Sequence, residues 1–548
     1  MARSIIDPVT RIEGHLRVEM EVDGGVVKDA WVSGGLFRGL EMIVKGREPR
    51  DAYFISQRIC GVCPISHGHT STLATEAALY KNGAKTPENA RIIRNLLEGA
   101  QFLHSHILWF YNLAALDWVN PVNALKANIA DTYALAEKAG TSVADFGAVQ
   151  KRLKAFVENG QLSIFSGHWF DSPGYNLPPE LDLIATAHYL EALTKQAEAS
   201  QISAIIGGKM PHVMTTAAGG TTWVPSEEKL ADVLFRFQDL NKWIASTMVP
   251  DTLAIAPFYM DAAGYGAGVG DFGAWGVFEE KDRDPKKRAL PAGMLIGGQL
   301  TDVDETKILE YVKHSYYTSK SGLNPTVGET VPEYSDYNLD GKYTWSKAPR
   351  YDGKPIEMGG LSRILVAYTR GVPRIKALVD TTLAALGTPG KPVPVSALVS
   401  TLGRVAGRNL EALYVSELMI TYMNELIANI KGGDSKFYEP LNSEDGEGTG
   451  MWEAPRGALL HYTNVKGNKI ENYQAIVPST WNVSPRDDND VRGPMEAALI
   501  GCPVESIEKP LHALRTVHSF DPCIACAVHV SEPKTGKSFK VMTSPLGR

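Results

Sequence analysis

The stretch QRICGVCPISHGH, residues 57–69, places Cys60 and Cys63 three positions apart with two histidines close behind. Near the other end of the chain, HSFDPCIACAVH, residues 518–529, repeats the arrangement with Cys523 and Cys526. The chain has five cysteines in 548 residues, so four of them fall in these two pairs. A fold that uses both pairs in one site must bring the two ends of the chain together.

Two CxxC pairs fit three kinds of site, and their spacing alone does not choose among them. A structural zinc module usually spaces its pairs about 15–20 residues apart, far closer than the pairs of this chain. A thioredoxin-type redox motif needs only one pair on a βαβ unit, so this interpretation leaves the second, similar pair without a role. The third kind is a buried metal centre closed by both ends of the chain. Four thiolates are soft ligands that suit zinc, Fe–S iron, or nickel with iron.

The composition is that of an ordinary globular protein and excludes several classes of partner. Basic and acidic residues number 55 and 62, for a net charge of −7, and no long basic run occurs. Nucleic acid is therefore not expected as a partner. No apolar stretch reaches the length of a membrane span, and the start, MARSIIDPVTRIEGH, lacks the apolar core of a signal peptide. We interpret the fifth cysteine, Cys502, as a small buried apolar residue.

Small β elements are predicted at both ends of the chain. Residues 16–33 alternate apolar and polar side chains around a Gly-Gly turn, which predicts a hairpin. Residues 457–481 predict a second hairpin that turns at Gly467-Asn468. The Gly-, Asp- and Tyr-rich region 260–360 predicts short strands and loops, and 431–452 predicts a loop.

Long helices are predicted for the interior. Residues 86–119 carry apolar side chains at helical spacing that become nearly continuous, which is typical of a helix buried on most sides. Thr86 is its predicted cap, and Ser226 caps a helix over 226–247. Further helices are predicted at 145–158, 180–199, 373–386 and 409–430. The predicted fold class is mostly α with small β elements (α+β), a buried bundle of long helices decorated by β-hairpins and loops.

The residues around the two pairs identify a family. Arg58 and Gly61 complete an R-x-C-G-x-C frame, and Asp521 with Pro522 precedes the second pair. With these frames the sequence closely resembles the large subunit of [NiFe] hydrogenases. The resemblance extends in order over nearly the whole chain, through DPVTRIEGHLRVE (7–19), LFRGLE (36–41), PRDA (49–52), LIATAHYLEAL (183–193), STLGR (400–404), EAPRGALLHY (453–462), VPSTWN (477–482) and RTVHSFDPCIACAVH (515–529).

The resemblance implies one large, multi-lobed catalytic subunit over residues 1–529. Its expected parts are the hairpin 16–33, a helical core at about 86–250 and 373–430, the insert at about 260–360 and a metal-closing segment 453–529. In this family a dedicated endopeptidase cuts after the histidine that matches His529. Residues 530–548, which are polar and lack core character, are therefore expected to be a removable extension.

The resemblance also implies a nickel–iron centre that cleaves H2 reversibly. By carry-over, Cys60, Cys63, Cys523 and Cys526 hold nickel, and Cys63 and Cys526 also bridge to an iron that carries carbon monoxide and cyanide. Cys523 is then the first base, and Glu13 in RIEGH is the next proton carrier. A satisfied structural carboxylate is the alternative interpretation of Glu13.

Five further residues are expected around the centre. Ser479 would hydrogen-bond a cyanide, Pro455 and Val477 would wall the diatomic ligands, and His67 would donate to a bridging sulfur. Arg456 matches an arginine whose guanidinium lies over the centre, a role that suits a planar permanent cation.

Asp521 is the expected carboxylate partner of Arg456, and a buried structural pair is compatible with that role. Glu41, the backbone carbonyl of Ala475 and His529 match a magnesium site, with iron as an alternative metal. Carboxylate and carbonyl oxygens suit such a hard cation.

One position departs from the family. Relatives commonly have aspartate in the LH-D-H segment of the buried helix, whereas LHSH places Ser105 there. A serine cannot supply negative charge beside Arg456, which puts similarity in rate, oxygen tolerance and protonation in doubt. The flanking His104 and His106 are interpreted as satisfied core histidines.

The expected partners follow from the family. No cysteine cluster is left for an electron relay, so an Fe–S small subunit is required, with a maturation endopeptidase, nickel chaperones and a cytochrome acceptor as further partners. The respiratory, hydrogen-uptake class places the protein in the periplasm or at the membrane through an exported small subunit, and the cytoplasm is the alternative. A regulatory hydrogen sensor and a zinc-stabilised structural protein are the alternative functions.

Overall fold

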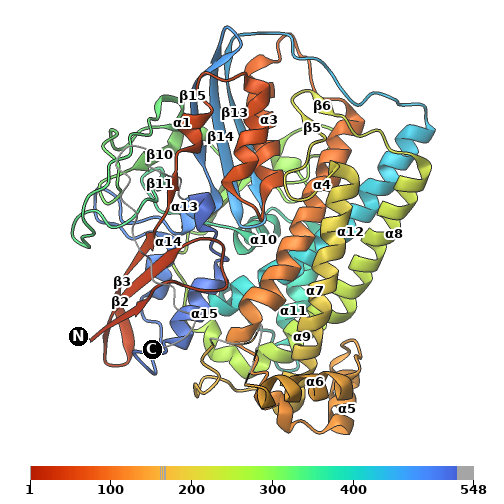
Figure 1. Ribbon diagram of the computed structural model, residues 1–548, viewed down its shortest axis with the longest axis vertical. Helices are drawn as coiled ribbons and strands as arrows, with labels where there is room; N and C mark the ends of the chain where they lie inside the picture. The colour runs from red at the N-terminus through yellow and green to blue at the C-terminus, as the bar shows by residue number, and fades with distance from the viewer. Residues whose placement is uncertain (1, 161, 163–164, 166–167, 528–548) are drawn as a thin grey trace.

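The computed structural model describes residues 2–160, 162, 165 and 168–527, apart from the side chains of residues 526 and 527. Within this part of the chain, long helices pack side by side and small sheets flank them, which confirms the predicted α+β class (Figure 1). The helices are α1 Leu40–Ile43, α2 Ala52–Ser56, α3 Pro64–Leu79, α4 Glu88–Ile107, α5 Ile129–Ala139, α6 Phe146–Glu158, α7 Pro179–Gly207, α8 Glu227–Trp243, α9 Val249–Ile255, α10 Gly360–Thr369, α11 Pro373–Ala385, α12 Thr401–Lys431, α13 Pro478–Asn482, α14 Pro494–Leu499, α15 Leu511–Ser519 and α16 Ile524–Ala527.

In the described part of the chain, every strand except β4 belongs to one of five small sheets. Their bounds are β1 Ala2–Ile6, β2 Leu16–Asp23, β3 Val26–Gly34, β4 Phe37–Arg38, β5 Thr216–Ala217, β6 Gly220–Thr221, β7 Phe272–Ala274, β8 Gly293–Ile296, β9 Gln299–Thr301, β10 Ile308–Tyr311, β11 Ala348–Tyr351, β12 Glu357–Met358, β13 Gly446–Ala454, β14 Gly457–Lys466 and β15 Lys469–Ile476. The strand orders are β1-β2-β3, β5-β6, β12-β7-β8-β9, β10-β11 and β13-β14-β15.

Helix α4 packs along both α7 and α12 (Figure 1). It is buried on most sides, as the continuous apolar pattern predicts, and continues as a π-helix over Leu108–Ala114. The predicted cap is wrong. The Thr86 hydroxyl donates to Glu76 Oε2 at 3.1 Å, and Pro87 occupies the cap position without a side-chain bond. The Thr86 hydroxyl therefore bonds to the buried Glu76 carboxylate and not to the first backbone N–H groups of α4.

The other predicted helices are present, and two of them are longer than predicted. Ser226 caps α8 by accepting the Lys229 N–H at 3.3 Å. Helix α7 extends to Gly207, and α12 begins at Thr401 rather than at residue 409. The reason for the early start of α12 is Ser400, whose hydroxyl oxygen accepts the Gly403 N–H at 3.0 Å.

The predicted loop at 431–452 is partly wrong, because β13 begins at Gly446 and adds a third strand to the predicted hairpin β14–β15. Its glycines look like loop residues in the sequence but serve close packing. A Cβ on Gly448 or Gly450 would lie 2.4 Å from Ala74 O or 2.3 Å from Thr70 O in α3. The turn at Gly467-Asn468 is confirmed, and the end of the predicted hairpin is instead α13.

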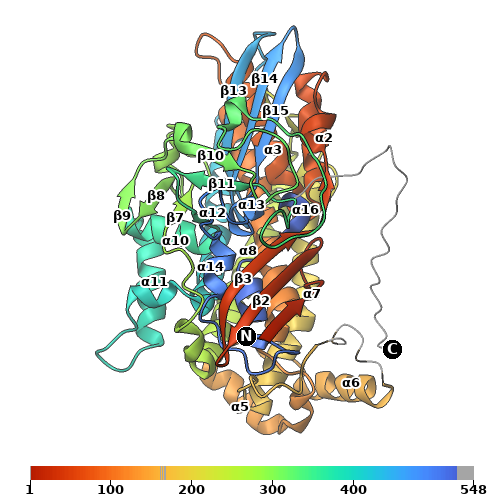
Figure 2. The same ribbon diagram turned by 90° about the vertical axis from the view of Figure 1, so that its left-hand side faces the viewer.

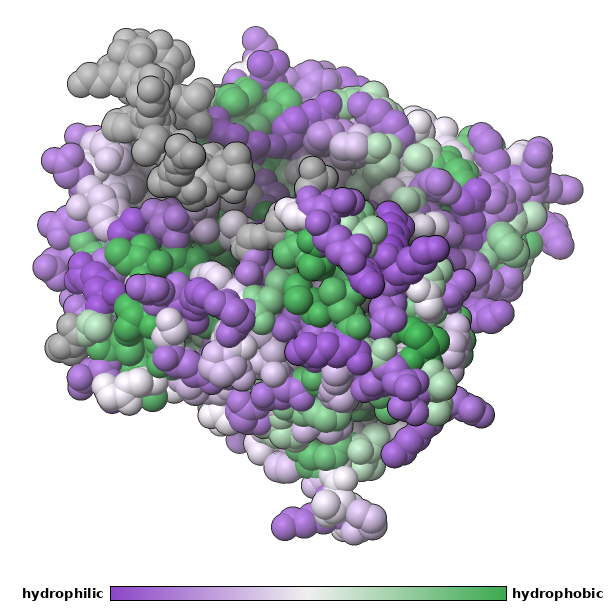
Figure 3. Space-filling view, turned by 60° about the horizontal axis from the view of Figure 1, so that its bottom comes forward, coloured by the Kyte–Doolittle hydropathy of each residue, from purple (hydrophilic) through white to green (hydrophobic). Residues whose placement is uncertain are grey.

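The N-terminal hairpin β2–β3 is confirmed, with β1 as an added edge strand. Figure 2 shows this sheet in front of the bundle, with the insert strands β7–β9 beside α10 at the left. Among the described helices, none combines the length and apolar character that crossing a membrane requires. On the face drawn in Figure 3, polar side chains are interspersed with small apolar patches.

Candidate metal centre

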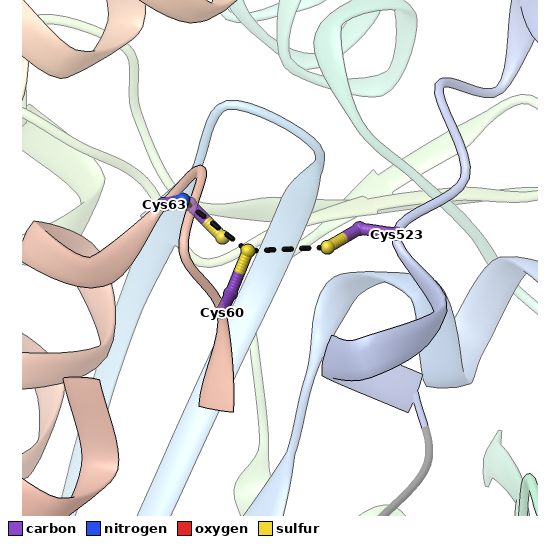
Figure 4. A group of neighbouring side chains, drawn as sticks. All are labelled: Cys60, Cys63 and Cys523. Atoms are coloured by element: carbon purple, nitrogen blue, oxygen red, sulfur yellow. Dashed lines mark hydrogen bonds between the residues drawn. The ribbon is translucent and has the colours of Figure 1, made fainter. Parts of the chain in front are cut away.

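Three of the four paired cysteines come together. The sulfur atoms of Cys60, Cys63 and Cys523 are buried and lie within 4.8 Å of one another. Figure 4 shows the three side chains pointing toward one another. The Cys60 and Cys523 sulfurs are 3.2 Å apart, and the backbone N–H groups of Val62 and Cys63 both point at Cys60 Sγ at 3.3 Å. Such N–H groups stabilise a thiolate. The fourth residue, Cys526, belongs to α16, but its side chain lies outside the described part and its ligand role stays a prediction.

A short backbone pairing joins the two ends of the chain at this centre. Glu13 forms a parallel bridge with Cys523, and the Ile524 N–H donates to the Glu13 carbonyl at 2.8 Å. Gly14 makes the approach possible. Its φ is +85°, and a Cβ there would lie 2.8 Å from the Ala525 nitrogen. Only glycine tolerates both conditions without strain.

Arg38 ties the two cysteine segments to each other. Its guanidinium donates to Arg58 O at 2.7 Å, to Ile59 O and to Ala525 O at 2.8 Å, so one side chain contacts the backbone on both sides of the centre. Sequence reasoning assigned no role to this arginine. Its only signal was its place in LFRGLE, three residues before Glu41.

Glu13 faces the centre with its carboxyl group. The Cys523 thiol donates to Glu13 Oε2 at 3.2 Å, and the Ala525 N–H donates to the same oxygen at 2.7 Å. Burial raises the pKa of Glu13, and the nearby Cys60 raises it further, whereas the bond from Ala525 opposes the shift. The carboxyl group can therefore hold a proton that a surface glutamate would release.

Arg456 is a buried cation whose charge interacts with the cysteine sulfurs. Its Nη2 is 3.0 Å from Asp521 Oδ1, and its Nη1 donates to the Ser105 hydroxyl at 3.2 Å. Burial opposes its charge, but Asp521 and the neighbouring cysteine sulfurs raise the pKa of Arg456 well above the usual value. Ser105 thus stands beside Arg456 as a neutral group, and Asp521 is the carboxylate in contact with it.

Two of the residues expected to wall the centre, Ser479 and Val477, lie against its cysteines. Ser479 Oγ accepts the Cys523 N–H at 2.9 Å, which leaves its hydroxyl hydrogen for another acceptor. Val477 belongs to the same apolar cluster as the three cysteines, and the Pro455 carbonyl accepts Arg363 Nη2 at 2.7 Å.

His67 Nδ1 lies 3.3 Å from His461 Nε2, and burial lowers the pKa of His67 to about 4. A bond from His67 to sulfur stays a prediction.

Two of the residues predicted to bind magnesium also meet. Glu41 Oε1 accepts the Ala475 N–H at 2.8 Å, and Glu41 Oε2 accepts the Thr330 hydroxyl. Lys347 lies nearby, 3.4 Å from Thr330 Oγ1 and 3.2 Å from Glu310. Sequence reasoning missed Thr330 and Lys347. His529 lies outside the described residues.

The remaining predictions concern core residues. Cys502 is fully buried, its sulfur lies 3.3 Å from Thr516 Oγ1, and burial raises the pKa of its thiol to about 12. His106 is a buried core histidine whose Nε2 lies 2.8 Å from Glu411 Oε2, but its Nδ1 has no hydrogen-bond partner among the described residues, so the predicted satisfaction is only partial. Burial lowers the pKa of His104 to about 4.

Comparison with known proteins identifies relatives over almost the full length. A family model described as nickel-dependent hydrogenase matches residues 38–529, and one described as HoxL-like matches residues 4–33. The chain is 40% identical to the uptake hydrogenase large subunit of Bradyrhizobium diazoefficiens, covering 98% of this chain and 97% of that one. It is 37% identical to the quinone-reactive Ni/Fe-hydrogenase large chain of Wolinella succinogenes, covering 99% and 98%. A solved [NiFeSe]-hydrogenase of Dm. baculatum superposes with a TM-score of 0.81 at 35% identity, covering 96% of this chain and 100% of that one.

Proposed function

The chain belongs to the nickel-dependent hydrogenase family as a large subunit, and we propose that it cleaves H2 heterolytically into two protons and two electrons. The observation that carries the proposal is the meeting of Cys60, Cys63 and Cys523 next to Glu13 and within electrostatic reach of Arg456. Soft ligands, a proton acceptor and a fixed cation are the groups that splitting a nonpolar molecule requires.

The residues present suit a nickel–iron centre. Cys60, Cys63, Cys523 and Cys526 would hold nickel, and Cys63 and Cys526 would also hold iron. Two orphaned polar atoms fit a group placed among the sulfurs, because Arg456 Nε and Asp521 Oδ2 are buried without a hydrogen-bond partner in the described part of the chain. When bound, the two metals supply the site that polarises H2 and takes up its electrons.

The protein's own residues handle the first proton. The Cys523 sulfur accepts it, and the proton then passes over 3.2 Å to Glu13 Oε2. Arg456 keeps a positive charge beside the sulfurs and so stabilises their anionic form. Ser479 and the walls formed by Val477 and Pro455 would hold the cyanide and carbon monoxide of the iron in a dry pocket.

The proposed cellular setting rests on the relatives. Electrons would leave through an Fe–S small subunit, and a cytochrome or quinone would accept them, in line with the uptake and quinone-reactive names of relatives. The small subunit would carry the complex to the periplasm or membrane. Chaperones would insert nickel, an endopeptidase would cut after His529, and Glu41, Ala475 and His529 would bind magnesium.

Infrared spectroscopy of the purified complex tests this function. The mature chain is isolated with its partner, and spectra are recorded under hydrogen and under air. Sharp carbon monoxide and cyanide bands that shift with the gas, together with nickel by metal analysis, are expected. Zinc in place of nickel and no such bands would return the cysteines to a structural role.

A further inference from the structure

A stripe of polar residues runs along one face of the buried helix α4. Its members follow one another at spacings of three and four residues, so they share a face: Arg91, Arg94, Glu98, Gln101 and Ser105. Each is at most 4% exposed. Burying so many polar groups costs free energy unless they hydrogen-bond to one another. The stripe is therefore expected to belong to a buried hydrogen-bond network.

Glu98 is the centre of this network. Its Oε2 accepts the Ser66 hydroxyl of α3 at 2.8 Å, and its Oε1 lies 3.2 Å from His69 Nδ1, also on α3. Gln101 Nε2 donates to Ser66 Oγ at 2.5 Å. Two helices thus enclose one carboxyl group that the proposed chemistry at Cys523 and Glu13 does not use.

The outer end of the network opens on a cavity. His69, Arg91, Arg94 and Trp452 line this space of about 300 Å³ next to the first turns of α4. His69 therefore connects Glu98 with a volume large enough for several waters. Arg94 is already paired with Glu76 at 2.6 Å.

The inner end lies at the metal centre. Ser105, one turn beyond Gln101, touches Arg456 at 3.2 Å. Ser66 lies one turn after Cys63 at the start of α3. The Cβ atoms of residues one turn apart lie about 5–6 Å from each other, a spacing at which one water can bridge the two side chains.

Burial of the pair favours a proton on the carboxyl group and a neutral imidazole. Burial raises the pKa of Glu98 to about 8, against the opposing bond from Ser66. Burial also lowers the pKa of His69, and the positive charges of Arg94 on α4 and Arg288, which lies over the Trp452 ring of β13, lower it further. The neutral imidazole can then receive a proton at one nitrogen and release one from the other.

We propose that Ser66, Glu98 and His69 form a second proton route, separate from Glu13, between the metal centre and the cavity at the N-terminal end of α4. The route rests on the proposed function. A bridging water gives a proton to Ser66 Oγ as the Ser66 hydroxyl proton moves to Glu98 Oε2. The carboxyl group passes one proton to His69 Nδ1, and His69 Nε2 releases one to water in the cavity. One proton enters, one leaves, and no electrons move.

Deuterium exchange followed by infrared spectroscopy tests the outer half of the route without relying on enzyme activity. The carbonyl band of protonated Glu98 is identified as the band that Glu98→Gln removes. On mixing with D2O this band should shift quickly in the native complex and at least about tenfold more slowly in His69→Phe, because the relay through the imidazole is lost. Equal exchange rates in the two proteins, or no band removed by Glu98→Gln, would overturn the route.

The pH profile of hydrogen oxidation tests the inner half. Above about pH 8 the ionised carboxylate accepts protons, so Glu98→Gln should lower kcat there by about tenfold and change it little at about pH 6. Ser66→Ala should lower kcat in the same pH range. Tyr80→Phe is the matched control, because Tyr80 lines the same cavity but donates to Glu439 O. Unchanged profiles in Glu98→Gln and Ser66→Ala would refute the route, whereas a native complex without hydrogen oxidation would refute the proposed function instead.

Discussion

At the scale of single residues, one oxygen of Glu13 receives both the Cys523 thiol and the Ala525 amide. Glu13→Gln keeps the shape and an acceptor oxygen but cannot carry a proton. At about pH 6, where the route through Glu98 contributes little, we expect kcat for hydrogen oxidation to fall by about 10²–10⁴-fold, the range for a positioned acid–base group. Hydrogen uptake by the purified complex measures the loss.

The interpretation of that loss depends on an intact centre. The carbon monoxide and cyanide bands of Glu13→Gln should match those of the native complex. Glu13→Asp retains a carboxyl group on a shorter side chain and should recover part of the rate. Full activity in Glu13→Gln would show that protons leave by another route.

Arg456 places a fixed cation by contacting two groups, Asp521 and Ser105, from separate nitrogens. Lysine keeps the positive charge but has one amino nitrogen in place of the two terminal nitrogens of the guanidinium. Arg456→Lys therefore cannot contact Asp521 and Ser105 in the same way. We expect a decrease in kcat of about 10–100-fold, or about 1.4–2.7 kcal/mol of transition-state stabilisation, and shifted infrared bands.

Arg404→Lys is the matched control for Arg456→Lys. Arg404 is also buried and forms a bidentate pair, with Glu357, at 2.8 and 2.7 Å. Its replacement should lower stability and leave the infrared bands unchanged. If both variants shift the bands equally, the effect belongs to loss of packing and not to the position of Arg456.

At the scale of elements, strand β13 packs its glycines directly against helix α3, whose N-cap residue is Cys63. Gly450→Ala would place a Cβ 2.3 Å from Thr70 O. We expect a loss of about 1–3 kcal/mol in the free energy of unfolding, as for other overpacked sites, measured by denaturant titration. Gly147→Ala in α6 is the control, since its nearest neighbour would be the Asp145 side chain at 3.6 Å. A neutral Gly450→Ala would mean that the strand can move away from α3.

The same elements show what sequence can and cannot predict. Periodicity and the Ser226 cap locate α8 because both signals are local. Strand β13 is missed because the glycine signal depends on a helix that lies far away in sequence. The paired cysteines and Glu13 are found through their motifs. Arg38 is missed because it donates to backbone carbonyls, which every residue has and which the sequence therefore does not distinguish.

At the scale of the whole molecule, the centre exists only when residues near both ends of the chain meet. Glu13 and Cys523 are paired through their backbones, and Arg38 joins the segments around Cys60 and Ala525. The surrounding core contains several buried carboxyl groups whose charge depends on pH. Folding, metal binding and proton uptake are consequently linked in this protein.

Glu496 provides a way to measure that link away from the metal centre. Its Oε1 accepts Val32 N at 3.1 Å and the Tyr343 hydroxyl at 2.9 Å, and burial raises its pKa to about 7 from the usual 4.5. Because the folded protein binds this proton more tightly than the unfolded chain does, the stabilisation is complete below pH 4.5 and is lost as pH rises through about 7. The fully buried group should account for about 3 kcal/mol of this loss.

Glu496→Gln keeps both accepted bonds and cannot ionise, so it should remove that part of the pH dependence. We expect the native complex to lose stability between about pH 5 and pH 8, and the variant to lose about 3 kcal/mol less over the same range. Thermal unfolding at a series of pH values measures the difference. Glu471→Gln, at an exposed position of β15, is the control and should follow the native curve. Parallel curves for the native complex and Glu496→Gln would show that Glu496 is ionised in the folded protein, with water or an ion compensating its charge.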